Sequence, residues 1–258
     1  MLRELRLFLT AIQFFTRLPV PAWVGHSAQQ LEQAARYFPL VGICVGALTA
    51  AILWLGAQVL PLSLAVALSM AVSIIITGAF HEDGLSDFAD GLGGHSREKV
   101  LAIMKDSRVG TYGVIALVLV LLLKYQALLE LCSMQSPLYI VAALIAAHAV
   151  SRLLAASIML TQHYVRDDDS ARARPAAQQI SPASFTIALL TGVTALGILL
   201  AAGAHPISVL VAVIAALLMR AYLASRLQKR LGGYTGDCLG AVQQLSELAF
   251  YLGLLINI

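Results

Sequence analysis

Seven stretches of mostly apolar residues, each long enough to cross a lipid bilayer as a helix, constrain this chain more than any other feature. A helix needs about 20 such residues to cross the hydrocarbon core. Hydrophobic residues make up 59% of the sequence and charged residues 12%, which is about half the charged share of a soluble domain. We predict an all-α, polytopic membrane helix bundle that forms one integral-membrane domain over residues 1–258. The predicted spans are residues 37–59, 62–80, 111–131, 138–160, 185–203, 207–224 and 239–256.

The N-terminal stretch over residues 2–18 is apolar, but it does not read as a further span. Basic residues precede its apolar run, as they do in a signal peptide. However, Gln13 and Arg17 interrupt the run, and no small-residue cleavage site follows. We predict an interfacial or re-entrant helix here. Residues 19–36 are expected to form a loop or a short surface helix.

The lysines and arginines outside the predicted spans fall in alternate connections. The intervening turns at residues 60–61, 132–137 and 204–206 contain none. Cytoplasmic loops carry the excess of basic residues, so the pattern places all the basic connections on the cytoplasmic side. We predict a multi-pass protein of a bacterial inner membrane, with its long polar loops and active site facing the cytoplasm. The basic residues are Arg3, Arg6, Arg17, Arg36, Arg97, Lys99, Lys105, Arg108, Arg166, Arg172, Arg174, Arg226, Lys229 and Arg230.

Net charge and cysteines exclude other classes. The formal net charge of +3 is too small to indicate a nucleic-acid partner. The three cysteines (Cys44, Cys132 and Cys238) are scattered, and they have neither the spacing of a zinc site nor that of a disulfide framework. The lipid bilayer is the partner that the sequence predicts directly.

Acidic residues gather immediately after the second predicted span, at Glu82, Asp83, Asp87 and Asp90. On a helix, positions 83, 87 and 90 fall within an arc of roughly 60°. Carboxylates stacked one turn apart repel each other unless a cation neutralises them. Hard oxygen ligands suit Mg²⁺, with Mn²⁺ as the alternative. We predict a divalent metal site on these residues; a solvated acidic loop is the alternative interpretation.

The neighbours of the acidic segment receive separate predictions. His81 falls on the opposite side of the helix from the aspartates, which favours a structural or hydrogen-bonding role over metal binding. Gly84 and Gly91 are expected to let phosphate groups of a substrate approach the backbone.

Groups suited to phosphate lie at the start of the third span, within residues 105–113. Lys105 and Arg108 carry positive charge, and Ser107 and Thr111 offer hydroxyl donors. A helix N-terminus there adds its dipole. These four residues are candidate substrate contacts, and an ordinary basic anchor with a helix cap is the alternative.

A second glycine-rich element, residues 231–240, precedes the seventh span on the same membrane face as the acidic segment. Asp237 could join the acidic site across the bundle as a metal ligand, and Gly236 is a candidate substrate contact. The simpler role for this element is a helix N-cap.

Charged residues also lie inside the predicted spans, among them Lys124, Arg152, Arg220 and Glu247. Such residues usually face the bundle interior or a wet cavity. We expect Glu247 to form a structural ion pair with Lys124 or Arg152; the functional alternative is that it lies on a proton or ion path. Arg152 and Arg220 are expected to snorkel or to line a substrate groove.

Several of these motifs, in the same order along almost the whole chain, resemble the adenosylcobinamide-GDP ribazoletransferases, the membrane-bound cobalamin synthases. They are residues 15–21, 38–42, 81–94, 103–113 and 232–237. Glu82 departs from the family pattern, in which an apolar residue is usual, and adds a carboxylate either as a metal ligand or as a group beside the ligands.

The resemblance implies a reaction. The 3′-hydroxyl of α-ribazole, or of α-ribazole 5′-phosphate, attacks the pyrophosphate of adenosylcobinamide-GDP and expels GMP, which gives adenosylcobalamin or its 5′-phosphate. We expect Mg²⁺ on Asp83 and Asp87 to neutralise the pyrophosphate. Asp90, one turn further, is expected to take the proton of the attacking hydroxyl. The candidate phosphate contacts are Lys105, Arg108 and Arg17.

Two other functions remain alternatives. A CDP-alcohol phosphatidyltransferase also uses aspartates at a membrane face, but the arginine of its motif is missing after Asp83 and Gly84. A metal-ion transporter would need acids on a continuous path through the spans, whereas Glu247 is the one acid deep inside a span. A homo-oligomer is compatible with the sequence, although no residue requires one.

Overall fold

The computed structural model describes residues 2–25, 27–166 and 178–256. Within these residues every regular element is a helix, and Tyr164 and Tyr234 form an isolated bridge. The predicted all-α class is confirmed. The helices are α1 (Leu2–Phe15), η1 (Ala22–Val24), α2 (Ala28–Ala34), η2 (Ala35–Tyr37), α3 (Phe38–Gly56), α4 (Leu62–Thr77), α5 (Phe80–Gly91), α6 (Arg97–Met104), α7 (Thr111–Met134), α8 (Pro137–Thr161), α9 (Pro182–Ala201), α10 (Pro206–Leu231) and α11 (Gly236–Leu254).

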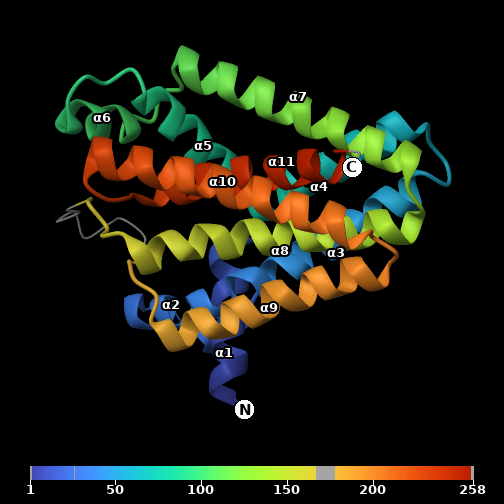
Figure 1. Ribbon diagram of the computed structural model, residues 1–258. Coiled ribbons are helices and arrows are strands. Elements are labelled where there is room, and N and C mark those ends of the chain that lie inside the picture. The colour runs from blue at the N-terminus through green and yellow to red at the C-terminus, as the bar shows by residue number, and fades with distance from the viewer. Residues whose placement is uncertain (1, 26, 167–177, 257–258) are drawn as a thin grey trace.

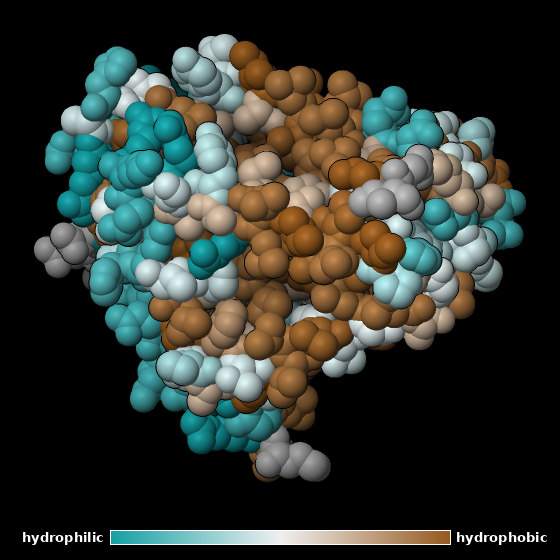
Figure 2. Space-filling model, in the orientation of Figure 1, coloured by the Kyte–Doolittle hydropathy of each residue, from teal (hydrophilic) through white to brown (hydrophobic). Residues whose placement is uncertain are grey.

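The axes of the long helices α7, α8, α9 and α10 are roughly aligned, with successive helices running in opposite directions, whereas α1 stands steeply across them (Figure 1). Helix α6 lies at one end of this bundle, and the connection between α3 and α4 lies at the other (Figure 1). Figure 2 shows hydrophobic side chains over the middle of the bundle and hydrophilic ones over the end that carries α6. An apolar band between polar ends is the surface expected of a protein that crosses a bilayer.

In the part of the chain that the structure describes, five helical segments are long and apolar enough to cross a membrane, and the bent pair α4–α5 would make a sixth. The five are residues 28–56 together with α7, α8, α9 and α10. The chain is therefore a polytopic helical membrane protein. The seventh predicted span corresponds to α11, which is a helix but is less apolar than the other five, because polar residues occupy its middle.

Helix α4 ends at Thr77, and the chain turns by 87° into α5. Two consecutive residues in the left-handed region make this turn, Gly78 at φ 63° and Ala79 at φ 57°. The backbone amide of Arg17 donates to the Ile76 carbonyl at 2.7 Å, and the Arg17 guanidinium packs on Gly78. The predicted span over residues 62–80 therefore ends early, and α5 starts in a new direction.

Helix α11 lies inside the bundle and carries a buried ionic group. Glu247 pairs with Lys124 of α7 at 2.5 Å and lies 3.6 Å from Nδ1 of His148 on α8. Gln243 donates to Glu247 at 2.6 Å, and Arg152 donates to the His148 carbonyl at 2.9 Å. The predicted Glu247–Lys124 pair is confirmed. Together with His148 of α8, this pair connects α7, α8 and α11 in the apolar interior.

The N-terminal segment is amphipathic. Helix α1 buries Leu7, Ala11 and Phe15 on one side and leaves Leu2 and Leu5 exposed. Residues 19–36 contain the short helices η1 and α2, as expected for a loop with a short surface helix. The placement of α1 at the membrane interface stays a prediction. Two of the basic residues used for the orientation, Arg172 and Arg174, lie outside the described residues.

Candidate active site

Helices α5 and α11 approach each other closely where each has a glycine. A Cβ on Gly84 would lie 2.9 Å from the Asp237 carbonyl oxygen, and one on Gly240 would lie 3.0 Å from the His81 carbonyl oxygen. A Cβ on Gly91 would likewise lie 2.8 Å from Cγ of Met104. Helix packing therefore fills the Cβ position of both glycines, although Gly84 also lines the cavity described below. Their predicted role in opening the backbone to phosphate stays a prediction, and the packing at Gly84 brings Asp237 next to the acidic helix.

This contact gathers an acidic cluster from two distant segments, formed by Asp83 and Asp87 of α5 and Asp237 of α11. The charges of Asp83 and Asp237 both act on Asp87, and Asp83 acts on Asp237. Burial raises the pKa of Asp237, while Arg166 and the Thr235 hydroxyl oppose that shift. The structure thus places Asp237 within the electrostatic reach of Asp83 and Asp87, and its role as a metal ligand stays a prediction.

Arg166 supplies the positive charge of the cluster. Its guanidinium lies 3.0 Å from a carboxylate oxygen of Asp237 and also donates to the Met104 carbonyl at 3.3 Å. The backbone holds it there, because Val165 donates to the Tyr234 carbonyl at 3.0 Å and Tyr234 donates to the His163 carbonyl at 2.9 Å. From the sequence, Arg166 was expected only to mark the cytoplasmic side. Its ion pair with Asp237 was not predicted, because no local motif marks it.

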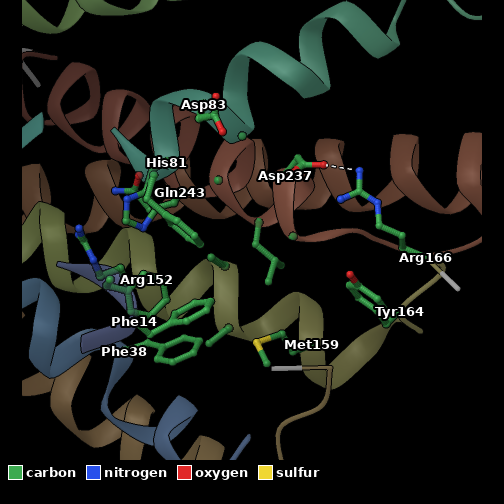
Figure 3. Close-up of a pocket in the computed structure, with 18 residues that line it drawn as sticks. Phe14, Phe38, His81, Asp83, Arg152, Met159, Tyr164, Arg166, Asp237 and Gln243 are labelled. Atoms are coloured by element: carbon green, nitrogen blue, oxygen red, sulfur yellow. Dashed lines mark hydrogen bonds and ion pairs between the residues drawn. The ribbon is translucent and has the colours of Figure 1, made fainter. Parts of the chain in front are cut away.

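A cavity of about 220 Å³ opens beside the cluster. Asp83, Asp237 and Arg166 line one side of it, and aromatic side chains line the other (Figure 3). Gly236 also lines the cavity, as expected of a substrate contact. Arg152 reaches it as well, in line with the expectation that this residue lines a substrate groove. The full aromatic and apolar lining comprises Phe14, Phe15, Phe38, Phe80, Ala155, Ala156, Met159, Tyr164 and Leu239.

Asp90 is held differently from the other aspartates of α5. Its two carboxylate oxygens accept hydrogen bonds from the backbone amides of Gly110 at 2.7 Å and Gly113 at 2.8 Å. These amides belong to the N-terminal turn of α7, where a carboxylate satisfies unpaired donors and complements the helix dipole. Asp90 is therefore a cap for α7, and this geometry does not support its prediction as general base or metal ligand.

Glu82 points into the bundle and is 7% exposed. One of its oxygens accepts a hydrogen bond from Gln244 of α11 at 2.9 Å. Lys124, Arg152 and Glu247 are its charged neighbours. The structure places Glu82 with the buried ionic group of α7, α8 and α11, away from the acidic cluster, so this geometry does not support the predicted metal contact.

The candidate phosphate contacts at residues 105–111 lie outside the cavity. Arg108 is paired with Asp106 at 2.6 Å, and its hydrogen bonds lower the pKa of Asp106 to about 2. Lys105 and Ser107 are exposed, and Thr111 is the exposed first residue of α7. Arg17 contacts Gly78 at the α4–α5 turn and likewise lies outside the cavity lining. Any contact of these five residues with substrate stays a prediction.

The donor chemistry of the cluster suits a hard divalent cation, since its ligands are carboxylate oxygens. Repulsion among the three acids is the physical reason for them to take up a cation. Among the described residues, no three acidic, histidine or cysteine side chains converge closely enough to form a ready ion site. Metal binding would therefore require these carboxylates to draw closer together.

His81 stacks on Phe15, with ring centroids 5.5 Å apart and planes 10° from parallel. It is 3% exposed and lines the cavity below Asp83. The stacking agrees with the structural role predicted for it.

A membrane helix bundle that presents carboxylates and an arginine at the mouth of an apolar cavity has the groups of an enzyme that acts on phosphorylated, partly apolar substrates. Comparison with known proteins gives the particular family. The sequence model described as Cobalamin-5-phosphate synthase matches residues 7–255, so the chain belongs to that family. The resemblance stated from the motifs is confirmed.

The chain is also similar over its whole length to curated proteins named adenosylcobinamide-GDP ribazoletransferase. The relative from Leptothrix cholodnii is 48% identical, with 100% of this chain and 98% of the relative covered. The relative from Shewanella frigidimarina is 46% identical, with 98% and 95% covered. The relative from Shewanella oneidensis is 45% identical, with the same shares covered. No solved structure matches the chain.

Proposed function

We propose that this chain transfers the adenosylcobinamide-phosphate group of adenosylcobinamide-GDP to the 3′-hydroxyl of α-ribazole or its 5′-phosphate, with release of GMP. The relatives' names and the matching family support this reaction. In chemical terms, the hydroxyl oxygen bonds to the phosphorus that carries the cobinamide, the bond from that phosphorus to the GMP oxygen breaks, and the hydroxyl proton is released.

The observation that carries the proposal is the meeting of Asp83, Asp87 and Asp237 beside Arg166 at the mouth of the cavity. Phosphoryl transfer depends on positioning and charge stabilisation more than on covalent chemistry by the protein. A cluster with both signs of charge at a cavity mouth provides these two functions.

We assign the residues as follows. Asp83, Asp87 and Asp237 would hold Mg²⁺, or Mn²⁺ in its place. The bound metal supplies charge neutralisation at the pyrophosphate and at the departing GMP oxygen. Arg166, released from Asp237, contacts a phosphate oxygen through its planar set of donors. Because Asp83 lines the cavity whereas Asp90 caps α7, we assign Asp83 as the group that accepts the hydroxyl proton.

Neither alternative function is favoured. A CDP-alcohol phosphatidyltransferase would leave the family match over residues 7–255 unexplained. A transporter would need acids along a continuous path. The one acid buried in α11, Glu247, is instead neutralised by Lys124.

The location of the enzyme is part of the proposal. The apolar band supports a multi-pass membrane protein, and the basic connections support placing the end with α5 and α6 in the cytoplasm of a bacterium. The acidic cluster lies near this end, where the water-soluble substrate groups are available.

The experiment that tests the proposal uses the purified chain in lipid nanodiscs. It is supplied with adenosylcobinamide-GDP, α-ribazole 5′-phosphate and Mg²⁺, and GMP and the corrinoid product are separated by chromatography. We expect equal amounts of GMP and adenosylcobalamin 5′-phosphate, and neither without the acceptor. GMP formation at the same rate without the acceptor would indicate a hydrolase and would contradict the proposal.

A further inference from the structure

The cavity below the acidic cluster has an apolar aromatic wall. Phe14 and Phe38 lie 10° from parallel with ring centroids 6.4 Å apart, and Met159 of α8 lies beside them (Figure 3). Phe38 is 4% exposed and Met159 is 3% exposed, so this wall is sheltered from solvent. Flat aromatic ligands bind to such walls by stacking and by contact with the sulfur of methionine.

Two polar side chains interrupt this apolar lining on the side away from Tyr164. Arg152 and Gln243 both line the cavity, and they are only 2% and 1% exposed. Nε of Arg152 and Oε1 of Gln243 have no hydrogen-bond partner among the residues that the structure describes. The Arg152 side chain is held in place by its own helix, because its Nη1 group donates to the His148 carbonyl at 2.9 Å. Buried donors of this kind normally have partners, so the free Nε–H of Arg152 points to a ligand acceptor.

We infer that this cavity binds the aromatic base of the acceptor nucleoside, with the unsubstituted ring nitrogen of its benzimidazole accepting a hydrogen bond from Arg152. The inference rests on the proposed function, because that function supplies the acceptor. The base of α-ribazole is a flat bicyclic ring with two methyl groups and a single free nitrogen. The free ring nitrogen matches the Nε–H donor of Arg152, and the otherwise hydrocarbon surface of the base matches the aromatic wall.

The guanine of the donor is the competing occupant, because Arg152 and Gln243 could bond to its polar edge. Guanine, however, carries several donors and acceptors around its rings, and each one left unpaired in an apolar cavity opposes binding. Aromatic and aliphatic side chains make up most of the lining, which favours the methylated benzimidazole.

This placement also orients the acceptor for reaction. With the base against Phe14 and Phe38, the ribose extends toward Asp83 and Asp237 at the opposite side of the cavity (Figure 3). The 3′-hydroxyl then lies on the side of the cavity where the acidic cluster holds the pyrophosphate of the donor. The aromatic wall thus positions the nucleophile without contacting the reacting atoms.

The first test changes the ligand and leaves the protein intact. Binding of α-ribazole to the full chain in nanodiscs is measured by calorimetry without metal or donor. It is compared with an analogue in which a C–H group replaces the free ring nitrogen. We expect the analogue to bind about tenfold more weakly, the effect of losing one hydrogen bond to a charged donor. Equal affinities would overturn the contact with Arg152.

The second test fills the cavity. Met159→Trp adds bulk within it, whereas Leu160→Trp places the same side chain on the 38% exposed neighbouring position of α8. Phe38→Leu removes a stacking face with a smaller change of volume and provides a second variant if Met159→Trp fails to fold. For Met159→Trp and Phe38→Leu we expect the KM for α-ribazole to rise at least fivefold. The KM for adenosylcobinamide-GDP should stay within twofold, and Leu160→Trp should leave both values unchanged.

The outcomes separate this inference from the proposed function. If the wild-type chain releases GMP but the cavity variants raise the KM of the donor instead, the cavity holds guanine and the inference is overturned. Unchanged KM values in folded variants would overturn it as well. If the wild-type chain binds α-ribazole through this cavity but releases no GMP, the inference holds and the proposed reaction fails.

Discussion

At the scale of single residues, Asp87 and Asp90 lie one helical turn apart on α5 and have different surroundings. Asp90 is 9% exposed and accepts two backbone hydrogen bonds from α7, whereas Asp87 is half-buried and lies in the electrostatic field of Asp83 and Asp237. The helical register placed both on one stripe. Their neighbours on other helices differ, so that Asp90 caps α7 whereas Asp87 belongs to the acidic cluster.

Replacing Asp90 tests this division. Asp90→Asn places an amide NH₂ near donors that need acceptors, so we expect a loss of about 1–2 kcal/mol in the free energy of unfolding. The folded fraction should retain GMP release within a few-fold of wild type. Thermal unfolding and turnover per folded protein are measured together. A variant as stable as wild type but slowed by at least ~100-fold would instead restore Asp90 as the general base.

Metal binding by the cluster can be tested without catalysis. Mg²⁺ that binds only the folded chain stabilises it by about 2.7 kcal/mol at a concentration 100 times its Kd. We expect Mg²⁺ to raise the unfolding temperature of wild type and of Asp106→Asn, whose aspartate is paired with Arg108 outside the cluster. Asp237→Asn should lose this response. An equal response in all three proteins would place the metal elsewhere.

At the scale of helices, the site depends on how closely α5 and α11 pack. Because Gly84 contacts the backbone of Asp237, a larger residue would push the acidic cluster apart. Helical periodicity predicted the acidic helix, and the alternation of basic connections predicted that Asp237 lies on the same membrane face. These patterns could not find the Gly84–Gly240 contact, the bend at Gly78 and Ala79, or the ion pair of Arg166, because these depend on packing between segments distant in sequence.

Two glycine substitutions test this contact. Gly84→Ala places a Cβ 2.9 Å from backbone oxygen, so we expect a loss of about 1–3 kcal/mol in stability together with reduced turnover. Gly197→Ala on α9 is the matched control, because its Cβ would have no heavy atom within 4 Å among the described residues. The control should be neutral or slightly stabilising. Chemical unfolding in mild detergent measures both, and equal behaviour of the two variants would argue against the close packing.

The buried ion pair between Glu247 and Lys124 also holds two helices together, α11 and α7. Removing one partner of a buried pair leaves an uncompensated charge and is expected to destabilise the protein by about 3–5 kcal/mol. We therefore expect Glu247→Gln or Lys124→Met alone to unfold the chain at lower temperature, and the double variant to recover part of the loss. A double variant that is no better than the worse single variant would contradict direct pairing at 2.5 Å.

At the scale of the whole molecule, composition predicted the class, and the distribution of lysine and arginine predicted which end faces the cytoplasm. The apolar band and the polar end with α6 agree with that class (Figure 2). The count of spans was less predictable. Among the described residues, five of the seven predicted spans correspond to helices apolar enough to cross a membrane, and a sixth corresponds to the bent pair α4–α5. The seventh corresponds to α11, which its neighbours enclose and which carries polar residues inside the bundle. Hydropathy alone does not separate a span that faces lipid from a helix that other helices enclose.

The orientation has its own test. In a variant whose three native cysteines are alanine, His95→Cys places a thiol near α6, and Gln58→Cys places one at the opposite end, after α3. We expect a membrane-impermeant maleimide added to intact bacterial spheroplasts to label position 58 and not position 95. After lysis, both should react. Labelling of position 95 alone in intact cells would reverse the proposed topology.

The central claim is that aspartates from α5 and α11 together form the catalytic centre. Its most direct test compares initial rates of GMP release from adenosylcobinamide-GDP by wild type, Asp87→Asn, Asp237→Asn and Asp106→Asn in nanodiscs with saturating Mg²⁺ and acceptor. We predict a loss of at least ~100-fold for Asp87→Asn and Asp237→Asn, because each removes a charge that the transfer requires. Asp106→Asn should remain near wild type. Near-wild-type rates for a folded Asp237→Asn variant would contradict the claim.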